Sequence, residues 1–166
     1  MAAVKSTKGH LALVKAWHAL LAGAFLIAYV TADEDTYAMH QFAGYTVLTA
    51  IALRLLFGLV APAASPLRLP RPSWRAARNW LATRKGRHPL FAWFAASLLA
   101  VVGLVSLSGA LADGATWLED PHEVIAEASL WLIAAHIAFV TYMYAGRQWL
   151  ARIGTRLSAA PKETTR

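Results

Sequence analysis

The stretch MHQFAGYTVLTAIALRLLFGLV, residues 39–60, decides the fold of this chain. It carries one charged side chain, Arg54, and it exceeds the roughly 18 apolar residues that mark a transmembrane helix. Hydrocarbon offers no partners to backbone N–H and C=O groups, so a segment that crosses it must satisfy them internally, as a helix does. We therefore expect residues 39–60 to cross a membrane as a helix.

Three further runs, residues 11–30, 90–111 and 124–144, have the same character. The chain of 166 residues is 58% apolar with a mean hydropathy of +0.44, which does not suit a water-soluble domain. It has no cysteine, which excludes disulfides and thiolate-bound metal centres. The sequence predicts an all-α fold, a four-helix transmembrane bundle with helices at about residues 11–32, 39–61, 89–111 and 122–146. This membrane domain, residues 11–146, lies between an N-terminal segment, residues 1–10, and a basic tail, residues 147–166.

The basic residues lie on one side of the predicted bundle. Lys and Arg occur in the N-terminal segment, in the connection between the second and third helices and in the tail, whereas residues 31–38 and 112–121 contain acidic residues and no Lys or Arg. Loops rich in Lys and Arg stay in the cytoplasm, so we expect both termini to be cytoplasmic. A net charge of +7 would suit nucleic acid in a soluble protein, but topology and contact with anionic lipid explain it better here, and no nucleic-acid partner is expected.

Two segments beside the helices need an interpretation. Val30-Thr31-Ala32 resembles a signal-peptide cleavage site, but the first run is longer than the usual apolar region of about 7–15 residues and carries His18, so a helix that stays in place is expected. Four prolines after the second helix end it and begin a surface linker. Within that linker, residues 73–85 predict a short amphipathic turn, with Trp74 and Trp80 in the headgroup region and arginines for lipid phosphate.

Four histidines fall inside the predicted helices at two depths. His40 and His122 begin the second and fourth helices at the outer edge of the membrane. His18 lies about 10 Å inside the cytoplasmic edge, and His136, fourteen residues after His122, lies roughly 21 Å further along its helix, at a depth comparable to that of His18. A buried ionisable ring in a membrane needs a partner, so each of these histidines is a candidate functional residue.

The positions of the histidines favour two haem groups. Fourteen residues come close to whole helical turns, so His122 and His136 project from nearly the same face, and each is matched in depth by a histidine on another helix. Imidazole is a suitable axial ligand of haem iron on both sides. Histidines that only bond neighbouring helices, and a proton relay through Glu123 and Glu127, are the alternatives. A single zinc site cannot gather ligands some 21 Å apart.

Other residues give weaker indications. Gly44, one turn after His40, and Gly23, five residues past His18, would leave room for a flat ring, although close helix packing explains glycines equally well. Arg54 and His88 are candidates for contacts with a haem propionate or a quinone. The alternatives are that Arg54 snorkels to the cytoplasmic interface and that His88 is an ordinary interfacial residue.

The combined pattern resembles the bacterial cytochrome b561 family, which is related to the cytochrome b subunits of nickel–iron hydrogenases and formate dehydrogenases. The resemblance covers about residues 14–144 and is carried by Trp17-His18, His40 with Gly44-Tyr45 and Arg54-Leu55, Gly58, Gly86-Arg87-His88-Pro89-Leu90, His122-Glu123 and His136. It implies two b-type haems, an inner one between His18 and His136 and an outer one between His40 and His122. The segment before the third helix departs from the family's usual G-H-N-P-L-G, which puts a propionate or quinone role of that turn in doubt.

An iron with two imidazole ligands has no open position for oxygen or substrate, so the expected function is electron transfer. The resemblance implies exchange between the quinone pool and a redox partner such as a periplasmic cytochrome c, superoxide or a dehydrogenase subunit, and the chain could act as a quinone oxidoreductase. One alternative is a cytochrome b subunit that anchors a larger dehydrogenase or hydrogenase complex. Another is a haem-free membrane anchor or small transporter.

Overall fold

The chain is mainly helical in the part described by the computed structural model, residues 2–146 and 149, and no strand occurs there. Its elements are α1 (Ala2–Val30), η1 (Glu34–Thr36), α2 (Tyr37–Val60), α3 (Trp74–Thr83), α4 (Leu90–Ala112), η2 (Thr116–Leu118), α5 (Glu119–Thr141) and η3 (Tyr142–Gly146), the last being a π-helical turn. The predicted basic tail lies outside the described residues, apart from Trp149.

Four helical stretches are long and apolar enough to cross a membrane: Lys8–Val30, Glu34–Val60, Leu90–Ala112 and Thr116–Gly146. This confirms the predicted all-α fold with four transmembrane helices. Many large apolar side chains on these spans face outward, such as Phe42, Leu59 and Leu104. Outward apolar side chains are expected where the surroundings are lipid.

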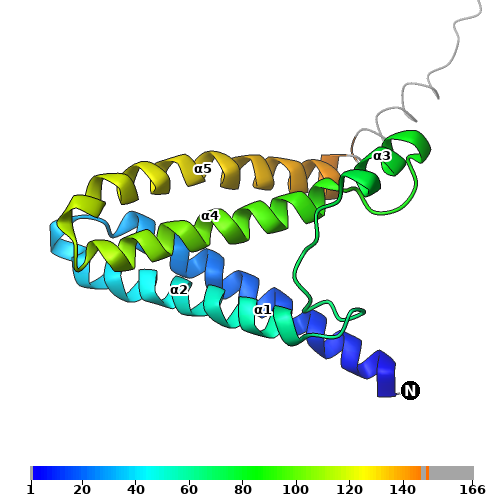
Figure 1. Ribbon diagram of the computed structural model, residues 1–166, viewed down its shortest axis with the longest axis horizontal. Helices are drawn as coiled ribbons and strands as arrows, with labels where there is room; N and C mark the ends of the chain where they lie inside the picture. Colours follow the sequence, from blue (N-terminus) through cyan, green and yellow to red (C-terminus); the bar gives the residue numbers. More distant parts are fainter. Residues whose placement is uncertain (1, 147–148, 150–166) are drawn as a thin grey trace, which may run out of the picture. The chain divides into compact units, whose positions relative to one another are not determined.

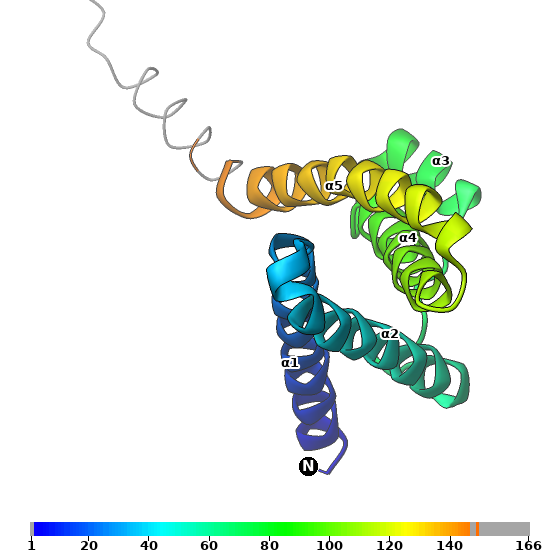
Figure 2. The same cartoon turned by 90° about the vertical axis from the view of Figure 1, so that its left-hand side faces the viewer.

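The chain divides into two compact units, Met1–Ser129 and Leu130–Arg166. The first contains α1 to α4 and the beginning of α5, and the second contains the rest of α5 and η3. Within the first unit, α1 lies along α2 and α2 along α4 (Figure 1). Figure 2 shows that α1 and α2 diverge from the short connection that joins them.

Small and branched side chains form the core of the first unit. Ala24 of α1, Val47 and Ile51 of α2 and Val102 of α4 are buried together. Small residues let helix backbones approach, and this close approach drives association where lipid is as apolar as the side chains. The indole N–H of Trp17 donates to the carbonyl of Ala50 at 3.0 Å, which adds a bond between α1 and α2.

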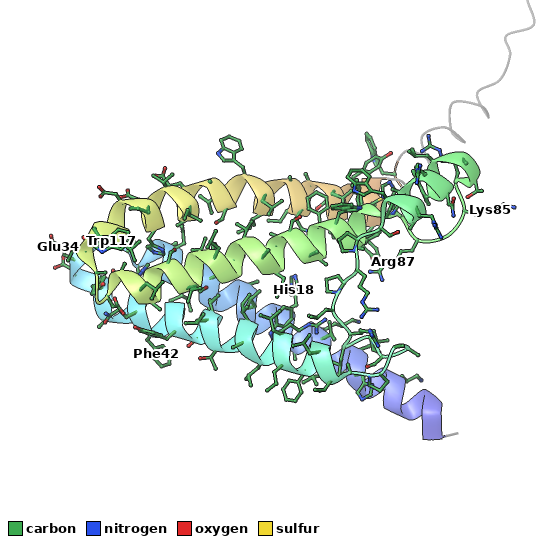
Figure 3. The ribbon with its side chains drawn as sticks, in the orientation of Figure 1. His18, Glu34, Phe42, Lys85, Arg87 and Trp117 are labelled. Atoms are coloured by element: carbon green, nitrogen blue, oxygen red, sulfur yellow. The ribbon has the colours of Figure 1, made fainter. Side chains whose placement is uncertain are left out.

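The two ends of the first unit carry opposite charge. Figure 3 shows Glu34 and Trp117 at the end where η1 and η2 lie, and Lys85 and Arg87 at the opposite end, beside α3. We call these the acidic end, residues 31–36 and 112–120, and the basic end, residues 61–89. The separation agrees with the one-sided distribution of Lys and Arg along the sequence.

The linker after α2 folds back onto the helix that it leaves. The guanidinium of Arg54 donates to the carbonyls of Leu67 and Arg68, the latter at 3.2 Å, and lies 5.7 Å from the centre of the Trp17 ring. Gly58 permits the return, because a Cβ atom there would lie 2.6 Å from the Leu69 side chain. Arg54 therefore holds the linker against the end of α2.

Candidate functional site

A cavity of about 590 Å³ opens at the acidic end of the first unit. Its walls come from α1, α2, α4 and the first turns of α5, and its lining includes His40, Gln41, Gly44, Tyr45, Asp113 and His122. The volume lies within the range of cofactor pockets, about 300–1,000 Å³. The cavity is therefore large enough for a substantial ligand.

Two histidines from different helices meet in this cavity. The ring centroids of His40 on α2 and His122 on α5 lie 6.2 Å apart, and the ring planes are inclined by 73°. A metal ion held between two imidazole nitrogens, each about 2 Å away, places the ring centroids about 6 Å apart. The two rings are therefore close enough to bind one group between them.

The backbone of α1 fixes the tautomer of His40. Its Nδ1 lies 2.7 Å from the carbonyl oxygen of Ala28. A carbonyl only accepts, so Nδ1 carries the proton and Nε2 keeps its lone pair. Metal-binding histidines usually donate their second nitrogen to a carbonyl or carboxylate in this way.

Ser108 of α4 fixes the tautomer of His122. Its hydroxyl donates to the carbonyl of Val105 at 2.9 Å, and its oxygen lies 3.1 Å from Nδ1 of His122. Because the single hydroxyl proton points to Val105, the oxygen accepts from the Nδ1–H of His122. The Nε2 atoms of both histidines are thus left as ligands.

Two glycines shape the cavity around these rings. Gly44 lines it, and a Cβ atom there would have no neighbour within 4 Å, so a flat ligand has room to approach α2. A Cβ on Gly109 would lie 2.9 Å from Cε1 of His122, so the imidazole packs directly on the backbone of α4. Any larger residue at position 109 would displace the ring.

A carboxylate clasp borders the cavity at the acidic end. Tyr37, Gln41 and Tyr45, spaced one helical turn apart on α2, donate to the carboxylate of Asp113 at 3.0, 3.0 and 2.5 Å. The hydrogen bond from Tyr45 is the main cause that lowers the pKa of Asp113, and the bond from Gln41 adds to it. The four residues, the Asp113 clasp hereafter, tie α2 to the connection between α4 and α5.

The remaining predicted residues lie elsewhere. His18 is exposed on α1 within the first unit (Figure 3), whereas His136 is partly buried on the part of α5 that belongs to the second unit, so their pairing stays a prediction. Arg54 and His88 do not line the cavity. Nδ1 of His88 accepts from the N–H of Leu90 at 3.3 Å, and its ring lies 4.1 Å from that of Trp80.

The donor set suits a macrocycle better than a bare metal ion. In the described ranges, no three His, Cys, Asp or Glu side chains gather closely enough to hold a metal ion. Two imidazoles alone do not complete the coordination of an iron ion. A haem would supply the remaining nitrogen ligands. The cavity, the two Nε2 atoms and the open side of Gly44 therefore fit a haem.

Sequence reasoning found His40, His122 and Gly44 but missed Ala28, Ser108 and Gly109. The last two had a visible signal, a polar residue and a glycine side by side in an otherwise apolar run, near the helix end that His122 faces. Ala28 had none, because it contributes only a backbone carbonyl.

Comparison with protein families gave one match. A family model described as prokaryotic cytochrome b561 matches residues 9–155, which is most of the chain. Comparisons with curated proteins and with solved structures found no match.

Proposed function

Because this chain belongs to the prokaryotic cytochrome b561 family, we propose that it transfers electrons across the membrane through two b-type haems. The observation that carries the proposal is the pair of His40 and His122, whose rings are 6.2 Å apart in a cavity of cofactor size. Two imidazole ligands leave iron no open position, which suits electron exchange rather than chemistry on a bound substrate.

The proposed outer haem lies between His40 and His122, and the proposed inner haem between His18 and His136. The family and the matched depths of the histidines along the sequence support this pairing. A propionate or quinone contact of Arg54 or His88 stays a prediction, and the bonds of Arg54 to the linker favour a structural role for that residue.

When bound, the haem supplies a reversible one-electron couple. The chain's own residues do the rest: Ala28 and Ser108 orient the two imidazoles, and Gly44 admits the ring. The Asp113 clasp joins the walls at the acidic end. Fixed ligands reduce the rearrangement that accompanies each change of charge.

We propose that the protein lies in a bacterial inner membrane with both termini in the cytoplasm and the acidic end outside. The proposed partners are the quinone pool and either a periplasmic cytochrome c or a dehydrogenase subunit. Co-purification of a large soluble subunit would favour a role as an anchor in a larger complex.

The haem content of the purified protein tests the proposal. We expect close to two haems per chain by pyridine haemochrome assay, with a low-spin b-type spectrum and no covalent attachment, since the chain has no cysteine. A content of one haem per chain would mean that one of the two proposed sites, inner or outer, does not exist. A protein without haem would support the haem-free anchor or transporter instead.

A further inference from the structure

We propose that α3 and the turn at residues 84–88 form a binding site for anionic phospholipids. The proposal does not depend on haem. Residues 37–112 contain no Asp or Glu, so the basic residues of the basic end have no counter-ions within that stretch: Arg68, Arg71, Arg75, Arg78, Arg84, Lys85 and Arg87. Such a concentration of positive charge beside a membrane span attracts anions such as lipid phosphates.

The helix α3 separates an apolar face from a basic one. At 100° per residue, Trp74, Ala77, Trp80 and Leu81 fall on one arc, and Arg75, Arg78 and Asn79 on the opposite arc. Trp74 is 72% exposed and Leu81 59% exposed. Helices with this division lie in the membrane interface, with the apolar face in the acyl boundary and the cations among headgroups.

Two ring contacts hold α3 at the depth of the interface. Near its start, the Trp74 ring lies 4.8 Å from that of Trp93, three residues inside the span that begins at Leu90. Near its end, the Trp80 ring lies 4.1 Å from that of His88, two residues before the span. Both ends of α3 are therefore tied within about one helical turn of the span's edge, so the helix lies along the membrane surface.

The following turn presents two guanidinium groups on aromatic rings. Arg84, in the left-handed conformation with φ of 53°, and Gly86, with φ of 85°, reverse the chain after α3. The guanidinium of Arg84 lies 4.7 Å from the centre of the Trp80 ring, and that of Arg87 lies 5.1 Å from the Phe91 ring. Stacking on the ring holds each planar guanidinium in place, and its N–H donors match the oxygens of a phosphate diester.

The exposed apolar face of α3 favours a lipid over a soluble phosphate as the ligand. A free phosphate or a nucleic acid would meet the arginines and leave Trp74 and Leu81 in water. An anionic phospholipid, such as phosphatidylglycerol, offers a phosphate to the arginines and acyl chains to the two apolar residues. A phospholipid satisfies both faces, and a net negative headgroup also balances the charge of the arginines.

The test uses the full chain in a neutral detergent, titrated separately with phosphatidylglycerol, phosphatidylcholine and inorganic phosphate, with bound lipid counted by native mass spectrometry. We expect phosphatidylglycerol to be retained and the other two not. The double variant R75Q/R78Q should weaken retention of phosphatidylglycerol about 30-fold, because each cationic residue near the surface contributes roughly a fivefold factor. The charge-matched control K8Q/K15Q, on α1 and away from α3, should keep it.

A second variant, L81Q, tests the apolar face at a position outside the core, because Leu81 is exposed. We expect it to weaken phosphatidylglycerol retention with every arginine intact. Equal retention of phosphatidylcholine, equal losses in R75Q/R78Q and K8Q/K15Q, or displacement of phosphatidylglycerol by inorganic phosphate at equal concentration would each overturn the proposal.

Discussion

At the scale of single residues, the orientation of the two imidazoles matters as much as their presence. His40 is held by a backbone carbonyl, which no substitution of a side chain removes, whereas His122 depends on the hydroxyl of Ser108. The two ligands of the proposed outer haem therefore differ in how they can be perturbed. Two predictions follow from this difference and from the proposed pairing.

Replacing His40 or His122 by Ala should remove the same redox component, while replacing His18 or His136 should remove the other. An iron that loses either imidazole leaves its low-spin state, so both members of a pair give the same phenotype. Potentiometric titration of the four variants measures this, with H10A as the control that changes neither component. If H18A and H40A abolish one component and H136A spares it, the proposed pairing is wrong.

Ser108→Ala should weaken retention of the outer haem and shift its midpoint potential. Loss of a hydrogen-bond partner behind a metal-binding histidine commonly costs about 10–100-fold in affinity. The matched control is Ser129→Ala, whose buried hydroxyl donates to the Ala126 carbonyl of its own helix at 2.6 Å. Haem content and the midpoint potential are the measurements, and equal effects of the two substitutions would mean that Ser108 has no special role.

At the scale of elements, α2 contributes most to the site. One face carries Tyr37, Gln41 and Tyr45 toward Asp113, and His40 and Gly44 line the same cavity. Because the Asp113 clasp joins α2 to the connection after α4, its strength should affect how firmly these two walls of the cavity are held together.

Tyr45→Phe should lower the midpoint of thermal unfolding by a few degrees at neutral pH, because it removes the shortest bond to Asp113. The pKa of Asp113 is lowered in the folded protein, so the clasp stabilises above the unfolded value of about 3.9 and is lost as pH falls through the folded pKa. The difference between wild type and variant should therefore shrink in acid. Tyr29→Phe is the control, because Tyr29 lines the same cavity but is not one of the donors to Asp113. A difference independent of pH would contradict this account.

The sequence predicted these elements unevenly, for physical reasons. Apolar runs such as residues 39–60 predict spans because lipid admits little else, and the depth of His40 and His122 sufficed to expect them together. The return of the linker onto Arg54 depends on the backbone carbonyls of Leu67 and Arg68. Every residue has such a carbonyl, so the sequence does not indicate which ones Arg54 binds. The sequence indicates only that Asp113 is an acidic residue in a connection between helices, because the side chains that donate to it lie about seventy residues earlier in the chain.

At the scale of the whole molecule, the separation of charge predicts the topology. A reporter fused after Arg166 should be active only in the cytoplasm, and one inserted near Gly114 should be active only outside, because the Lys- and Arg-rich segments stay in the cytoplasm. Paired enzymatic reporters that work on opposite sides measure this. The reverse pattern would exchange the sides of both proposed haems.

The cavity at the acidic end also sets an order for biogenesis. One of its histidines belongs to the second span and the other to the fourth, so the binding site is incomplete until the last helix has entered the bilayer. On the proposed assignment, cofactor loading is the final step of maturation and happens after synthesis of the membrane domain has finished. The bound ring would then act as a cross-link that fastens the last helix to those inserted earlier.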